Sequence, residues 1–287
     1  MFTHFVFWLW FAGLTFLIAG LVVVRKELIT ARGLDKLIAL GSVFVAAPLA
    51  TFGAEHFVDA RDIMQLVPVW MPAHLFWTYF VGCALISAAT SLVAMKFVRL
   101  SATMLGVMFF LFVLMMDLPF AIAHPANRLA WNFVLRESAF AGGAWALAGS
   151  QSLESRTEKQ NWMILIGRFC VALAAIYFGV EQLLHPEFSP GVPDMKLTPA
   201  WVPLHALWGY PVGAFLLVAG VALLLNRMPR TSAAWIGLVM TLLTLLLYLP
   251  ILAVTSQVSL MTDAINFVFD TLLFGGTALL IARALPA

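Results

Sequence analysis

Residues 70–82 read WMPAHLFWTYFVG, and residues 201–213 read WVPLHALWGYPVG. Seven of these thirteen positions are identical at a constant separation of 131 residues, from 70 to 201, and the identities include two tryptophans, a histidine and a tyrosine. An apolar composition alone does not produce such a match, and an internal repeat defines the architecture of a chain. The pair therefore predicts that the chain is duplicated.

Shorter matches extend the repeat on both sides. FGAEH at 52–56 matches FGVEQ at 178–182 with a separation of 126, so the second copy has five additional residues, which we expect in the proline-rich stretch 186–203. Each copy covers four apolar segments, and an even number of spans gives both copies the same orientation. Further matches downstream are Leu118-Pro119 with Leu249-Pro250, NFVLRE at 132–137 with NFVFD at 266–270, and Gly142-Gly143 with Gly275-Gly276.

The composition is that of a membrane protein. Of the 287 residues, 63% are hydrophobic and 10% are charged, whereas soluble domains carry roughly 25% charged residues. A membrane-spanning helix needs about 20 mostly apolar residues. We predict an all-α, polytopic protein with an N-terminal helix (1–30), a first four-helix unit (31–155) and a second one (156–287). The nine expected spans are 3–24, 37–58, 73–95, 101–122, 130–149, 162–184, 204–225, 233–254 and 262–284.

Lysines and arginines predict the orientation, because they accumulate on the cytoplasmic side. Eleven of them fall at one set of span ends and three at the other, namely Arg61, Arg128 and Lys196. The N-terminus is therefore expected outside and the C-terminus in the cytoplasm, in a bacterial inner membrane. The apolar start has no leading positive charge, so we interpret it as a retained helix rather than a signal peptide.

Charged side chains within a membrane are expensive and indicate functional sites. The predicted spans place six of them, and all six histidines (His4, His56, His74, His124, His185 and His205), towards the non-cytoplasmic side. The candidate catalytic residues are Glu55, Glu181, Glu137, Asp270 and Asp117. The candidate ligand-binding residues are His56, His74, His205, Arg136, Trp77, Trp208, Tyr79 and Tyr210.

Structural interpretations of the same residues stay open. Tryptophan and tyrosine at span ends form interfacial belts, His74 and His205 are suited to helix starts, and Arg136 with Glu137 is suited to a structural pair. The glycine pairs are typical of close helix packing. Cys83 and Cys170 lack a CxxC partner, and no helix carries the His-x3-His spacing of a metal site. We expect no metal and no nucleic-acid partner.

Several motifs resemble the DoxX-like membrane proteins. They are GRFCVALAAIYFGVEQLLHP at 167–186 with PAWVP at 199–203, and FGAEHF at 52–57 with VPVWMP at 67–72. The family unit is a four-helix membrane bundle, so the resemblance implies two such units over residues 37–285. The arginine that opens the family pattern matches Arg168, whereas the first copy has Ser42 there. The family supplies no agreed set of catalytic residues.

Three functions remain open at this point. The resemblance and the layer of acids and histidines suggest a quinone-linked redox subunit that binds a quinone or a lipid-like ligand and acts with a redox partner protein. The duplicated frame also suits a proton-coupled transporter or a lipid-handling protein. The third hypothesis is a non-catalytic assembly factor. The ligand and the oligomeric state are not determined by the sequence.

Overall fold

The computed structural model describes residues 4–151, 161–192, 196–205 and 207–286. Within these ranges the chain is almost entirely helical, and its extended structure is limited to one isolated bridge between Phe188 and Leu197. The all-α prediction is confirmed. The predicted boundary between the two units, at 155/156, and the charged stretch around it lie outside the described residues, as does the side chain of His4.

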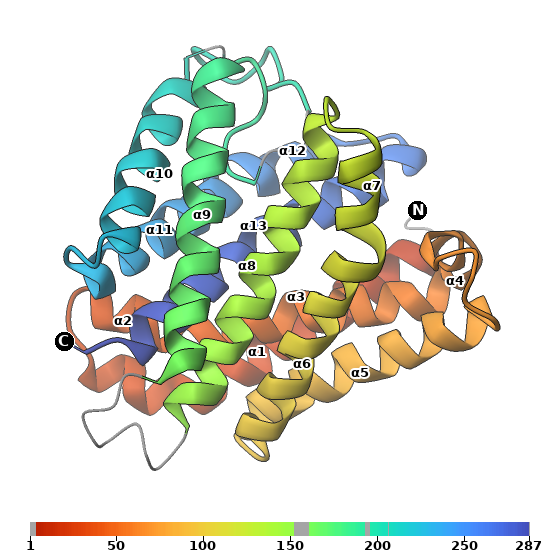
Figure 1. Ribbon diagram of the computed structural model, residues 1–287, viewed down its shortest axis with the longest axis horizontal. Coiled ribbons are helices and arrows are strands. Elements are labelled where there is room, and N and C mark those ends of the chain that lie inside the picture. Colours follow the sequence, from red (N-terminus) through yellow and green to blue (C-terminus); the bar gives the residue numbers. More distant parts are fainter. Residues whose placement is uncertain (1–3, 152–160, 193–195, 206, 287) are drawn as a thin grey trace.

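The helices surround a central pair formed by α8 and α13 (Figure 1). In chain order the elements are α1 (His4–Thr30), α2 (Leu34–Ala39), α3 (Gly41–Val58), α4 (Ala60–Ile63), η1 (Met64–Leu66), α5 (His74–Ala94), α6 (Val98–Phe112), η2 (Val113–Asp117), α7 (Leu118–Ala123), α8 (Arg128–Ser150), α9 (Trp162–Leu184), α10 (Gly209–Leu224), α11 (Pro229–Leu243), η4 (Thr244–Tyr248), α12 (Leu249–Val254) and α13 (Val258–Ala284).

Seven helices of the described chain are long and apolar enough to cross a membrane, some of them built from two or three of these elements. The other two predicted spans are α8, which carries Arg128, Arg136 and Glu137, and α10, which has only 16 residues. The protein is therefore an integral membrane protein, and a total of nine spans stays a prediction. In Figure 1, α1 starts and α13 ends on opposite sides of the molecule.

The predicted helix 204–225 begins later than expected, at Gly209. Leu204 has a φ of 54°, which a non-glycine residue adopts at a cost and which interrupts helical geometry. Residues 204–205 and 207–208 instead lie in turns, and Leu207 N donates to Leu204 O at 2.7 Å. His74 therefore opens a helix, whereas His205 lies in a turn before one.

Glycines bring the central helices close together. A Cβ at Gly167 of α9 would lie 2.2 Å from the carbonyl oxygen of Gly142 in α8. Correspondingly, Gly276 of α13 lies against the backbone of Phe44 in α3, and Gly41 of α3 lies against Leu279 of α13. The last helix of each predicted unit thus packs on the first helix of the other unit, so the two units share one core.

Unusual backbone conformations recur at the separation found in the sequence. The non-glycine residues with positive φ are Ala73, Met95 and Phe97, and then, 131 residues later, Leu204, Asn226 and Met228. A five-residue π-helix precedes Leu118-Pro119, and another precedes Leu249-Pro250. Such π-helical turns are rare and frequently mark functional sites.

Candidate functional site

Arg136 is the centre of a charged cluster between α8 and α13. Its Nη1 donates to Oδ2 of Asp270 at 2.9 Å, and its Nη2 lies 3.1 Å from Oε1 of the adjacent Glu137. The guanidinium also lies over the ring of Phe133, 4.8 Å from its centroid. The three charged side chains are 14–17% exposed. Residues 134 positions apart in sequence thus meet in a partly accessible site, which we call the Arg136 cluster, together with Asp117.

Two carboxyl oxygens of the Arg136 cluster lack a hydrogen bond. Asp117 lies at the end of the π-helix η2 and is near enough to Arg136 for their charges to interact. Its buried Oδ2 and the buried Oε2 of Glu137 have no hydrogen-bond partner among the described residues. A buried acceptor without a partner costs about 1–3 kcal/mol. A water or a ligand that donates hydrogen bonds would relieve this cost.

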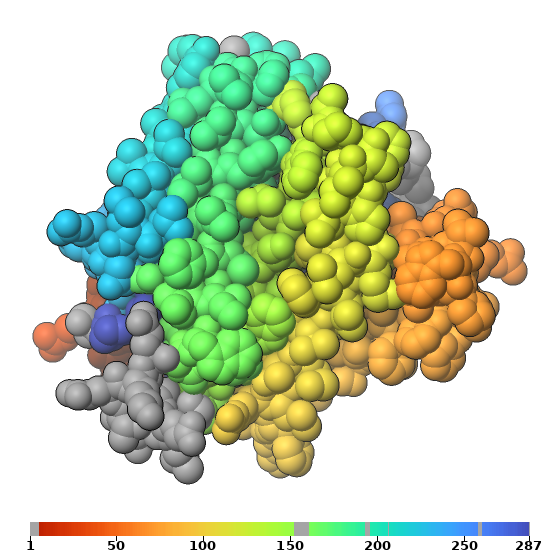
Figure 2. All heavy atoms as spheres, in the orientation of Figure 1, coloured from red at the N-terminus to blue at the C-terminus, as the bar shows by residue number. Residues whose placement is uncertain are grey.

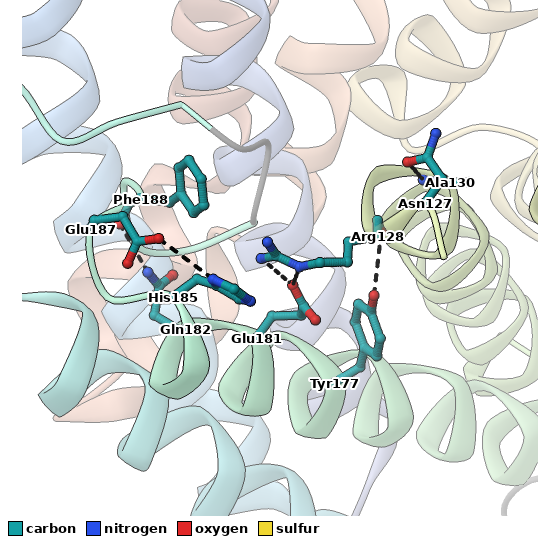
Figure 3. Close-up of polar contacts among 9 residues, drawn as sticks. All are labelled: Asn127, Arg128, Ala130, Tyr177, Glu181, Gln182, His185, Glu187 and Phe188. Carbon is teal, nitrogen blue, oxygen red and sulfur yellow. Dashed lines mark hydrogen bonds and ion pairs between the residues drawn. The ribbon is translucent and has the colours of Figure 1, made fainter. Parts of the chain in front are cut away.

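Glu55 lies on α3 and Glu181 lies on α9. Both side chains are nearly buried, but their hydrogen-bond partners differ. Oε1 of Glu55 accepts a hydrogen bond from Nδ2 of Asn266 at 3.0 Å, which joins α3 to α13. Oε2 of Glu181 lies 2.6 Å from Nη2 of Arg128, which joins α9 to α8 (Figure 3). One carboxyl therefore has an amide partner and the other a cation.

The α9–α10 connector lies beside Glu181 and its partner Arg128. Figure 3 shows Phe188 above the Arg128–Glu181 pair, and the Arg128 guanidinium lies 5.7 Å from the centroid of that ring. Nε2 of Gln182 donates to the carbonyl oxygen of Phe188 at 2.9 Å. Tyr177 donates to the carbonyl oxygen of Arg128 at 3.3 Å. This end of α9 is thus held by its own connector and by α8.

The surroundings of Glu55 are acidic instead. The carboxyls that act electrostatically on it belong to Asp270, Asp59 and Asp263, and among the described residues no arginine or lysine forms an ion pair with it. Glu55 therefore lies near Asp270 of the Arg136 cluster, at the end of α3, without a bond between the two carboxyls in the described contacts.

The aromatic candidates lie on the outer surface of the bundle. Tyr79, Trp208 and Tyr210 are 39–48% exposed, and Trp77 is half-buried among neighbouring phenylalanines. Tyr79 stacks on Phe57 at 5.6 Å. These positions suit an interfacial belt, and the contacts described for them do not include the Arg136 cluster.

The histidine candidates are also separate from the cluster. Nδ1 of His56 contacts the carbonyl oxygen of Phe52 at 2.7 Å, one turn earlier in α3. His74 is half-buried at the start of α5, and His205 is exposed. In the described part of the chain, no group of three or more His, Cys, Asp or Glu side chains is arranged to hold a metal ion.

At the opposite end of the molecule, Arg168 is buried and its Nη1 donates to Oδ1 of Asn226 in the α10–α11 turn. No local pattern in the sequence predicts this bond or the ion pair of Arg128. For Asn266 a signal was present, because Asn266 belongs to the repeated NFV motif.

The fold and the charged site define a class, namely a helical integral membrane protein with an ionic cluster between two central helices. Residues 163–249 match the DoxX family model. The match covers less than half of the chain and supports the DoxX-like membrane protein that the motifs predicted. The comparisons with curated proteins and with solved structures gave no match.

Proposed function

We propose that this DoxX-like protein binds a quinone or another lipid-like ligand and places the polar head of that ligand at the Arg136 cluster. The observation that carries the proposal is the pair of buried, unpartnered oxygens on Asp117 and Glu137 beside the Arg136 guanidinium. Ligand sites are mostly apolar and use a small number of placed polar groups for orientation. An ionic cluster inside an apolar bundle has this composition.

The chemistry of the cluster suits both forms of a quinone. Arg136 donates hydrogen bonds, which a quinone carbonyl accepts, and the carboxylates of Asp117 and Glu137 accept hydrogen bonds from the hydroxyls of a quinol. Reduction of a quinone to a quinol takes up two electrons and two protons. The carboxyl groups would deliver the protons, and a redox partner protein would deliver the electrons.

We also propose the two-unit repeat, with units at 31–155 and 156–287. It is supported by the recurring positive-φ residues and π-helices, and by one reciprocal contact in each half. Gly53 of α3 faces Gly82 of α5, and Gly179 of α9 faces Gly213 of α10, each carbonyl lying 2.8–3.2 Å from the Cβ position of the opposite glycine. The last helices align with a separation of 134, as from Asn132 to Asn266.

The proposed location is a bacterial inner membrane, with the N-terminus outside and the C-terminus in the cytoplasm. The distribution of lysine and arginine supports this orientation. It places the Arg136 cluster in the outer half of the membrane. Fusions of a reporter that is active only in the cytoplasm, and of one active only outside, to the C-terminus test the orientation.

The function is tested with purified protein in lipid nanodiscs. The ten tryptophans report binding of a short-chain benzoquinone and its quinol by fluorescence quenching, and extraction identifies quinones that co-purify. We expect saturable binding, which Glu137→Gln weakens at least fivefold and Glu187→Gln, at an exposed loop, leaves unchanged. Quenching that only increases linearly, as for partition into lipid, contradicts the proposal.

A further inference from the structure

The connector between α9 and α10 folds back into the second half of the molecule. Ser189 N donates to Lys196 O at 2.7 Å, and Thr198 N donates to Glu187 O at 3.0 Å. These bonds and the bridge between Phe188 and Leu197 close a small hairpin. In Figure 1 the connector descends from the end of α9 towards α12.

Residues 190–192 of this hairpin lie deep among the helices. The carbonyl oxygen of Pro190 accepts a hydrogen bond from the hydroxyl of Tyr248 at 2.9 Å, and this bond is buried. A Cβ at Gly191 would lie 3.3–3.7 Å from Leu243, Tyr248 and Thr271. Leu243 precedes Val254, the last residue of α12, by 11 residues. It therefore lies roughly 16 Å from that end of the helix, measured along the axis. The connector therefore fills a space within the bundle.

The residues that surround this space have counterparts in the first half. Tyr248, at the end of the second π-helix, corresponds to Asp117 at the separation of 131. Thr271 corresponds to Glu137 at the separation of 134 given by the adjacent NFV motifs, whereas the glycine pairs further along these helices are separated by 133. Two of the residues that contact the connector in the second half, Tyr248 and Thr271, thus occupy the positions of the two unpartnered carboxyls in the first half.

The same positions differ in exposure. Tyr248 and Thr271 are 3% and 1% exposed, whereas Asp117 is partly exposed and the side chain of Glu137 is 14% exposed. Ile251 is 4% exposed, and its counterpart Phe120 is 48% exposed. The first half therefore lacks the cover that the connector gives to the second half.

The connector of the first half lies elsewhere. Residues 59–72 form α4, η1 and an exposed turn, in which Val69 and Trp70 are 95% and 70% exposed. In Figures 1 and 2 this segment, drawn in orange, stands out at the side of the molecule, away from α7. It is also the shorter of the two connectors, by the five residues that separate an offset of 126 from one of 131.

We propose that the molecule has a single ligand-head site, in the first half at Asp117 and Glu137, and that Pro190–Gly191–Val192 fills the equivalent site of the second half. The connector is an internal substitute for the ligand and indicates its shape. Gly191 has no side chain, so the segment is slim at this point, and the first-half site accommodates a narrow group between η2, α8 and the ends of the neighbouring helices.

The difference between these first-half residues and their second-half counterparts indicates the chemistry of the ligand head. Tyr248 donates a hydrogen bond to the connector, whereas the carboxyl groups of Asp117 and Glu137, once they have given up their protons, only accept. The head that binds in the first half therefore donates hydrogen bonds, as a hydroxyl or an ammonium group does. The identification of the donor as a quinol rests on the proposed function, but the location of the site does not.

Paired cysteine variants test the location without any ligand. In a background with Cys83→Ala and Cys170→Ala, we compare Glu137→Cys with Thr271→Cys, and Asp117→Cys with Tyr248→Cys, using a small charged methanethiosulfonate in nanodiscs. We expect the first member of each pair to react at least ten times faster than the second. Equal rates within both pairs, or no reaction at any of the four positions, would overturn the proposal.

A residue exchange tests the ligand chemistry. The double variant Asp117→Tyr with Glu137→Thr gives the first half the residues that the second half already tolerates, so we expect a cooperative thermal transition as in the wild type. Binding is measured with a short-chain benzoquinol, decanol and decylamine as probes. We expect at least one of these donors to bind the wild type and to lose at least tenfold in affinity with the exchange.

The outcomes separate the two proposals. Binding of benzoquinol that survives the exchange overturns the single-site inference and the placement of the ligand head at Asp117 and Glu137, and leaves only quinol binding by the protein standing. Binding of decylamine or decanol but not of benzoquinol, lost on exchange, supports the site and contradicts the quinone function. If none of the three donors binds the wild type, the inference of a donor-binding site is wrong.

Discussion

Glu55 and Glu181 occupy matching positions in the two halves, yet Glu181 is paired with Arg128 and Glu55 is paired with the neutral Asn266. The two halves also differ at positions deeper in the molecule. The second half has Tyr248, Thr271 and its own connector where the first half has Asp117, Glu137 and two unpartnered oxygens. The comparison teaches that the second half is covered by its connector and has neutral residues at these positions. The first half has charged residues there, and they are partly exposed.

The contact between the halves is most sensitive at Arg136. Arg136→Met leaves Glu137 and Asp270 without their cation in an apolar surrounding, and removal of one partner of a buried ion pair costs about 3–5 kcal/mol. We expect this loss in the free energy of unfolding, measured by denaturant titration in mixed micelles. Adding Asp270→Leu to Arg136→Met should restore part of the stability; a double variant less stable than the single one contradicts a direct pair.

The glycine contacts predict unequal effects at equivalent positions. Gly167→Ala places a methyl group 2.2 Å from the Gly142 carbonyl oxygen, whereas Gly41→Ala places it 3.1 Å from the nearest atom of Leu279. Overpacking of this kind costs about 1–3 kcal/mol. We expect Gly167→Ala to lower the melting temperature clearly and Gly41→Ala to lower it less. The reverse order would show that the α3–α13 contact is the tighter one.

The two buried glutamates should also differ. Glu181→Gln replaces an ion pair with Arg128 by a neutral contact, and hydrogen bonds to charged groups contribute about 1.5–3 kcal/mol. Glu55→Gln keeps an amide oxygen that can accept from Asn266. We therefore expect the first substitution to destabilise the protein by about 1 kcal/mol or more beyond the second, in the same unfolding assay. Equal losses would remove the distinction between the two halves.

The smallest effect concerns Asp59, in the exposed connector of the first half. Burial and, to a smaller extent, the negative charge of Asp62 raise the pKa of Asp59 above its ordinary value. A carboxyl with a raised pKa is destabilising when ionised, so stability is highest below its ordinary pKa and falls as the pH rises through that range. Asp59→Asn should therefore raise the melting temperature slightly at pH 7 and have no such benefit at pH 3. A benefit that is the same at both pH values would contradict this cause.

The sequence predicts the frame of the molecule well, because long apolar segments and repeated motifs are local signals. Residues 167–186 lead to the family resemblance, and residues 70–82 and 201–213 are the basis of the proposed duplication. The candidate carboxyls were also found from their position within apolar segments, since charge at that depth is rare.

The partners of these carboxyls could not be predicted in the same way. Arg136 and Asp270 meet because α8 packs on α13, and no local pattern encodes that contact. The connector 186–203 has no periodicity, so its hairpin and the insertion of Gly191 follow only from tertiary packing. Trp77, Trp208, Tyr79 and Tyr210 stay candidate ligand-binding residues, and the exposed positions of Tyr79, Trp208 and Tyr210 also suit the membrane interface.

The central claim is that the two halves share a frame and that only the first offers a site. Its most direct test is the stoichiometry of benzoquinol binding to protein in nanodiscs, measured for the wild type and for Asp117→Tyr with Glu137→Thr. The account predicts one molecule bound per chain in the wild type and none in the double variant. Two molecules per chain, or one that persists in the double variant, would contradict it.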